Sequence, residues 1–116
     1  MLNNSPHLDR LFHALSDPAR RAMVARLSQG PVSLGELAKP LPMSLPAVMQ
    51  HLKVLEGAGL VRSEKLGRVR TCAIDSQALS QAEQWLTTCR VEWERRLDRL
   101  GAYLDTLEGE EDGNER

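Results

Sequence analysis

The sequence predicts a mainly α-helical domain with a small β-hairpin and a long helix at its C-terminal end. Apolar residues recur at intervals of three and four over most of the chain, which is the spacing of amphipathic helices. Two short segments rich in Arg and Lys meet at Gly67, which predicts two strands joined by a tight turn. The last third carries an uninterrupted apolar stripe. At 116 residues the chain has room for one modest core, so we expect a single domain.

Three helices are predicted before residue 43. Each begins at a Ser or Asp, a residue type that caps helix N-termini, and the first two continue with proline in the first turn. The first runs from Ser5 to Leu15, the second from Asp17 to the Gly30-Pro31 stop, and the third from Ser33. The third must be short because Pro40 follows closely.

Ser44 is predicted to cap a fourth helix over residues 45–57, with Val48, Leu52 and Leu55 on its apolar side. Strands are expected over 60–65 and 69–74, with residues 66–68 as the turn. A helix followed by a cationic hairpin is the layout of a winged helix-turn-helix. The helix fits the major groove of DNA and the hairpin, or wing, can lie along the phosphates.

A fifth helix is predicted over residues 76–108, beginning at Asp75 or Ser76. Roughly 30 helical residues span about 45 Å, more than a core of this size can cover. We therefore expect a homodimer built on this helix with help from the first; the alternative is a helix folded back onto its own domain. The organisation predicted is a DNA-binding region over 1–75, a dimerisation helix over 76–108 and a disordered acidic tail over 109–116. The expected interface comprises Leu8, Leu11, Phe12, Leu86, Cys89, Trp93, Leu97, Leu100 and Leu104.

The charge is divided unevenly along the chain. Residues 1–75 hold ten Lys or Arg against six Asp or Glu, whereas residues 76–116 hold five against ten. This division favours a polyanion-binding face in the first part, although ordinary solvated charge is the alternative. Two cysteines, no apolar run of membrane-spanning length and no signal-peptide core indicate a reduced cytoplasmic setting without a membrane partner. No catalytic triad, Cys-His pair, carboxylate pair or phosphate-binding loop is evident in the sequence, so we expect that the protein is not an enzyme.

Residues near the start of the second helix of such a motif reach base edges. Gln50 is the best candidate for a base reader, because an amide can bond adenine N6 and N7 together; a solvated amide or a phosphate contact is the alternative. Leu45, Pro46 and Met49 can contact a thymine methyl, and for Leu45 and Met49 the alternative is packing against the third helix. Cationic side chains are candidates for phosphate contacts, although a solvated charge is the alternative for each. The full set of DNA-binding candidates is Ser44, Leu45, Pro46, Ala47, Met49, Gln50, Lys53, Lys65, Arg68, Arg70, Arg20 and Arg21.

Three segments resemble the ArsR/SmtB family of winged helix-turn-helix repressors: residues 15–21 (LSDPARR), residues 44–60 and the Gly67-Arg68 pair. The resemblance implies a dimer, an operator of two inverted half-sites, and repression by blocking a promoter. The run from Trp85 to residue 97 is similar to a non-metal subgroup. Many relatives carry Ser at the position of Met49, so we expect a polar DNA contact to be absent or replaced and the sequence preference not to follow from the family. Many carry Tyr at the position of Cys72, and we expect this departure to affect wing packing.

No metal or other cofactor is expected. Metal-sensing relatives carry thiolates in the third helix, or His and carboxylates in the last. Here the third helix has no cysteine and the last has no histidine. Cys72 and Cys89 lack metal-ligand spacing and are expected to act as small apolar residues. A thiol- or metal-responsive repressor using Cys72 or Cys89 stays open as an alternative, as does a winged-helix module that binds protein. The effector is unknown.

Overall fold

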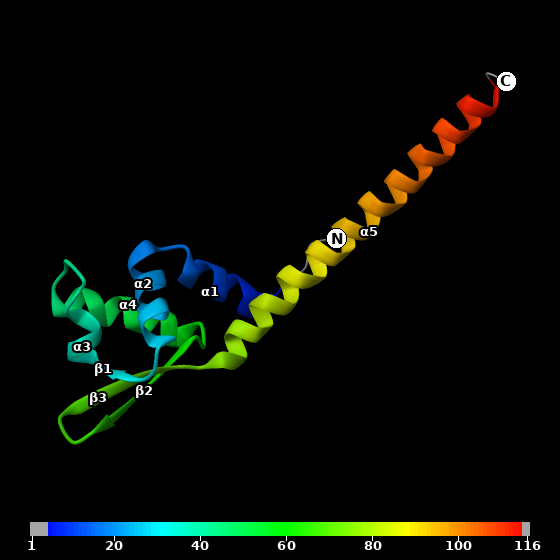
Figure 1. The fold of residues 1–116 in the computed structure, drawn as a ribbon. Coiled ribbons are helices and arrows are strands. Elements are labelled where there is room, and N and C mark those ends of the chain that lie inside the picture. Colours follow the sequence, from blue (N-terminus) through cyan, green and yellow to red (C-terminus); the bar gives the residue numbers. More distant parts are fainter. Residues whose placement is uncertain (1–4, 115–116) are drawn as a thin grey trace. The chain divides into compact units, whose positions relative to one another are not determined.

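The computed structural model describes the backbone of residues 5–114 and the side chains of residues 5–109. Within that range the chain forms five helices and three strands (Figure 1). It divides into two compact units, Met1–Ala82 and Glu83–Arg116. The elements in chain order are α1 (Pro6–Leu15), α2 (Pro18–Leu27), β1 (Val32–Ser33), α3 (Leu34–Ala38), α4 (Leu45–Gly57), β2 (Val61–Leu66), β3 (Val69–Ile74) and α5 (Ser76–Asn114).

The first four helices begin where the sequence predicts. The side chains of Ser5, Asp17, Ser33 and Ser44 each accept a hydrogen bond from the backbone N–H three residues further on. Each bond satisfies one of the N–H groups that the first turn of a helix leaves without a partner. Proline in the first turn of α1, α2 and α4 fits because no helical hydrogen bond is required there. The predicted caps are therefore confirmed.

The core of the first unit is aliphatic and lies where α1, α2 and α4 meet the sheet. Each helix contributes residues at helical spacing, and the beginning of α5 adds two alanines. In Figure 1 these helices gather on one side of the hairpin. The largest fully buried side chains are Leu11, Met23, Leu37, Leu55, Leu60, Val48, Val61 and Cys72.

The sheet has three antiparallel strands in the order β1-β3-β2, whereas the sequence predicted only the hairpin. The hairpin register pairs Lys65 with Arg70 and Leu66 with Val69 at its tip. The added strand β1 pairs Val32 with Cys72. Two residues are too few to produce an alternating pattern, and for that reason the prediction omitted this strand. Its effect is to anchor the middle of β3 beside the N-terminus of α3.

Two glycines shape the path from α4 into the hairpin. Gly59, with φ 76°, follows the end of α4, and Gly67, with φ 63°, forms the hairpin turn. Both values lie in the left-handed region that glycine adopts at little cost. The hairpin observed is displaced by one residue from the prediction at β2, since Leu66 belongs to the strand and not to the turn.

Helix α5 begins at Ser76, and the Asp75 carboxylate accepts a hydrogen bond from Gln77 N–H at 3.1 Å. Its first two turns belong to the first unit, where Ala78 and Ala82 are buried. The division between units therefore falls after residue 82 and not after 75. The helix continues to Asn114, six residues beyond the predicted end at residue 108. Residues 115 and 116 lie outside the described part. No helix within the described range combines the length and apolar character that a membrane span requires.

Candidate nucleic-acid interface

Helix α4 is held to the core along one side only. Val48 and Leu55 are fully buried and Leu52 is 2% exposed, which fixes the rotation of the helix about its axis. Ser44 caps the helix through Ala47 N–H at 3.4 Å. The side opposite the buried residues is therefore presented to solvent in a defined orientation.

The exposed side of α4 carries most of the DNA-contact candidates in its first two turns. Ser44, Pro46, Gln50 and Lys53 are exposed, and Ala47 is half-buried. Leu45 is 50% exposed and Met49 is 38% exposed. Neither side chain is buried, so part of each is accessible to a partner. The structure thus brings the predicted base-reading residues together on one face.

The wing supplies a cationic tip. Lys65 and Arg68 are exposed on either side of the Gly67 turn. Arg70 is half-buried, and one of its terminal nitrogens donates to Ser63 Oγ at 3.4 Å. Of the three wing cations that we predicted to contact phosphate, Arg70 therefore has an intramolecular partner on the neighbouring strand.

Two apolar residues at the wing tip were missed by the sequence analysis. Leu66 is 66% exposed and Val69 is 53% exposed, and they face each other across the hairpin. Their signal in the sequence was an apolar residue on each side of the Gly67-Arg68 turn, where polar residues are usual. Large apolar side chains at an exposed turn point to a contact surface.

Arg20 does not face a ligand, which corrects our prediction that it approaches the DNA backbone. It is 9% exposed. Its Nε donates to Ala14 O at 2.7 Å, and its terminal nitrogens donate to His13 O at 3.1 Å and to His51 Nδ1 at 3.1 Å. A guanidinium has donors only, so His51 Nδ1 accepts in this bond. Arg20 thus joins the carbonyl end of α1 to α4.

The neighbouring residues of this cluster are also engaged. Asp17 Oδ2 lies 3.9 Å from His51 Nδ1. The Arg20 backbone N–H donates to the Asp17 carboxylate and holds its pKa below the usual value. His51 is half-buried. Arg21 is exposed, with one nitrogen donating to Leu15 O at 2.9 Å, so it stays a candidate for a phosphate contact.

The expected dimer residues of the first unit divide into two groups. Leu11 is fully buried in the core of its own chain, so its assignment to the dimer interface is wrong. Leu11 belongs to the buried core that α1 forms with α2 and α4. Leu8 and Phe12 are half-buried and pack against that core.

The second unit exposes its apolar stripe over its whole described length. The large side chains are between 38% and 62% exposed. Cys89 is also exposed and has no disulfide partner. Exposed large apolar residues in this unit are Trp85, Leu86, Trp93, Leu97, Leu100, Tyr103, Leu104 and Leu107.

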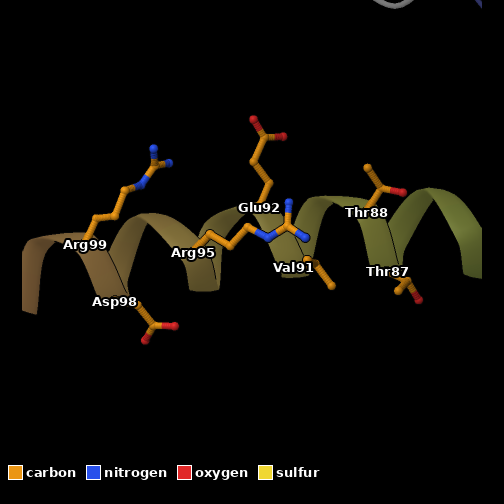
Figure 2. A pocket seen from close by; sticks show the side chains of 7 residues that line it. All are labelled: Thr87, Thr88, Val91, Glu92, Arg95, Asp98 and Arg99. Carbon is orange, nitrogen blue, oxygen red and sulfur yellow. The ribbon is translucent and has the colours of Figure 1, made fainter.

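A different side of the same helix is mainly polar. Figure 2 shows the side chains that border a shallow hollow along α5, and none belongs to the apolar stripe. The charged members leave the helix in different directions in this view. The residues are Thr87, Thr88, Val91, Glu92, Arg95, Asp98 and Arg99.

The cysteines occupy contrasting environments. Cys72 is fully buried on β3, and burial raises the pKa of its thiol. A raised pKa keeps the thiol protonated and unreactive at neutral pH. Among the residues described, no group of three or more His, Cys, Asp or Glu side chains is arranged to hold a metal ion.

The chain is similar to known proteins that contain a helix-turn-helix domain. A family model for a helix-turn-helix domain matches residues 15–64. The chain is 42% identical over 98 residues to the HTH-type transcriptional regulator Rv2034 of Mycobacterium tuberculosis, covering 84% of this chain and 89% of that protein. It is 25% identical over 79 residues to the transcriptional repressor SdpR of Bacillus subtilis, covering 68% and 88%. A crystal structure of an ArsR family transcriptional regulator matches with a TM-score of 0.75 and 46% identity over 81% of this chain and 97% of that one.

Proposed function

Because this chain belongs to the ArsR/SmtB family of winged helix-turn-helix transcriptional regulators, we propose that it is a homodimeric repressor that binds an inverted-repeat operator. The DNA contacts are made by α4 and by the wing formed by β2 and β3. The protein works as a binding protein without catalytic activity. Its compartment is the cytoplasm, because a repressor acts on the chromosome.

One observation carries the proposal: Gln50 and the cationic residues proposed to contact DNA are exposed, on α4 and at the tip of the wing. Gln50 and Lys53 lie on the exposed side of a helix whose rotation is fixed by fully buried Val48 and Leu55. A helix presented in this way fits the major groove. Lys65 and Arg68 are free to neutralise phosphates at the wing.

Base reading is assigned to Gln50. Its amide is exposed in the second turn of α4 and offers one donor group and one acceptor group in a plane. Adenine presents a matching N7 acceptor and N6 donor in the major groove. Lys53, one turn further along the helix, is assigned to the phosphate backbone.

The exposed stripe of α5 supports the homodimer. Leu86, Trp93, Leu100 and Leu107 recur every seven residues, with exposed fractions between 38% and 62%. A seven-residue apolar repeat is the pattern of helices that pack side by side. Eight large apolar side chains left in water favour association, and a second copy of the chain offers a stripe of the same length. A two-fold dimer presents two α4 helices to two inverted half-sites.

The experiment is selection of bound duplexes from a random DNA pool, followed by fluorescence anisotropy titrations of the selected operator across a range of salt concentrations. We expect an inverted repeat with half-sites about 10 base pairs apart or a multiple of that spacing. Arg68→Ala should weaken binding to all sequences about 5- to 10-fold, and two lost phosphate contacts per dimer should reduce the salt slope by about 1.8.

Arg62→Ala is the matched control. It removes the same charge from the same hairpin, but the Arg62 guanidinium already lies 3.7 Å from the Asp75 carboxylate. Its salt slope should stay close to that of the wild type. An unchanged slope for Arg68→Ala would remove the wing from the interface, and selection of no common sequence would overturn the proposal.

A further inference from the structure

The exposed large apolar side chains of the first unit are confined to two places. Among described residues up to 82, they are Leu45 and Met49 on α4, and Leu66 and Val69 at the wing tip. Every other large apolar side chain there is buried or half-buried. Such residues are costly to leave in water unless a partner covers them. Both places belong to the proposed DNA-binding surface.

Leu45 and Met49 form a pair on α4. They are four residues apart, so they neighbour each other on one side of the helix. Their exposed fractions are 50% and 38%. The exposed amide of Gln50 follows Met49 directly in the chain. The apolar pair and the polar reader therefore both lie on the exposed side of α4, the surface proposed to enter the groove.

The major groove offers few partners for such a patch. Its floor consists of hydrogen-bonding groups, with one exception, which is the C5-methyl group of thymine. Burial of a methyl group against an apolar side chain is favourable, whereas burial of an unpaired polar base edge is not. We propose that Leu45 and Met49 select thymine methyl groups in the operator half-site, next to the base pair read by Gln50. This inference rests on the proposed function and names the chemistry of its ligand.

The spacing of the pair limits where these thymines lie. Leu45 and Met49 are separated by about 6 Å along the helix axis, at 1.5 Å per residue. Base pairs are stacked at about 3.4 Å, so the two side chains reach methyl groups within about two base-pair steps of each other. With the adenine read by Gln50, the core of each half-site is rich in A·T pairs.

The test replaces thymine by deoxyuridine, which lacks only the methyl group, at each thymine of the selected operator in turn. Wild-type protein should lose about fourfold in affinity at one or two of these positions, corresponding to about 0.8 kcal/mol per methyl group. In Met49→Ala or Leu45→Ala the loss at the corresponding thymine should fall below about twofold. Met49→Leu should keep it, since leucine also presents an apolar surface.

Lys53→Ala is the control on the same helix. It should weaken binding to every duplex while leaving the deoxyuridine penalty unchanged. The inference is overturned if the wild type binds the selected operator but no single deoxyuridine changes its affinity, or if both alanine variants retain the full penalty. Absence of binding to any duplex would overturn the proposed function as well, so the two failures are distinguishable.

Discussion

The two units contain helices with the same kind of apolar stripe and very different surroundings. In α4 of the first unit, Val48 and Leu55 are fully buried. In the part of α5 that forms the second unit, Leu86 is 52% exposed and Trp93 is 62% exposed. Helical periodicity thus predicts that a face will be covered, but it does not predict by which chain. The difference indicates that the first unit is stabilised internally, and it supports the proposal that a second chain covers the stripe of the second unit.

The charged groups of the two units also differ in how far they are buried. In the first unit the Arg20 guanidinium is buried and bonded to two backbone carbonyls. In the second unit Arg90 and Glu94 form an exposed pair at 3.0 Å, one turn apart on the helix. Exposed pairs of this type contribute about 0.3–0.5 kcal/mol each. They support the helix but do not replace the burial of its apolar stripe.

The largest expected effect concerns the second unit, whose exposed stripe is the proposed dimer interface. Trp93→Asp places a charge in the middle of the exposed stripe. An aromatic anchor at the centre of an interface contributes at least about 2 kcal/mol, and a two-fold dimer loses it twice, so the dimer dissociation constant should rise at least about 1,000-fold. Sedimentation velocity across a concentration series measures this change.

Thr88→Asp is the control for that variant. It adds the same charge to the same helix, on the mainly polar side drawn in Figure 2. It should remain a dimer at concentrations where Trp93→Asp is a monomer. If both variants dimerise like the wild type, the stripe is not the interface. The far-ultraviolet circular dichroism of both variants should show that the first unit is still folded.

The next effect concerns the internal stability of the first unit. Arg20→Met keeps most of the side-chain volume but leaves the carbonyls of His13 and Ala14 without their charged donor. Loss of buried hydrogen bonds to a charged group should lower the free energy of unfolding by about 2–3 kcal/mol. Urea denaturation monitored by circular dichroism measures it.

Arg21→Met is the matched comparison, because Arg21 also bonds to a carbonyl of α1 but is exposed. Its free energy of unfolding should change by less than about 0.5 kcal/mol. If Arg21 touches phosphate, its variant should instead weaken binding to DNA. Equal stability of the two variants would contradict the structural role assigned to Arg20.

Much of the fold could be predicted because its signals are local. Helix caps depend on residues three apart, and the hairpin turn depends on Gly67 alone, so both can be read from short segments. The exposed side of α4 follows from its periodicity once the buried side is identified. The strand β1 gave no such signal, since its two residues become a strand only by pairing with β3, about 40 residues away.

The errors arose where tertiary context decides the role of a residue. Arg20 and Arg21 are adjacent and chemically identical, and both donate to carbonyls at the end of α1, but only Arg20 is buried and bonded to His51. Leu11 lies on the same apolar stripe of α1 as Leu8, but the stripe is wide enough that one side of it is fully buried. Distinguishing such neighbours requires the packing of several helices, which sequence spacing does not contain.

The smallest expected effect is a pH dependence confined to the first unit. The Asp17 carboxylate caps α2 by accepting from Arg20 N–H at 3.1 Å, and this bond lowers the pKa of Asp17 in the folded protein. Its contribution to stability is complete above the pKa of the unfolded chain and is lost as the pH falls through the folded pKa. Asp17→Asn keeps a capping oxygen without the charge. The difference in the free energy of unfolding between wild type and Asp17→Asn should therefore shrink between about pH 5 and pH 3, as measured by urea titrations.

Because a hydrogen bond is the main cause of the lowered pKa, the difference in the free energy of unfolding should persist in about 1 M salt, where charges farther than about 3 Å apart are screened. A difference that salt removes would assign the effect to the attraction of nearby cationic groups instead.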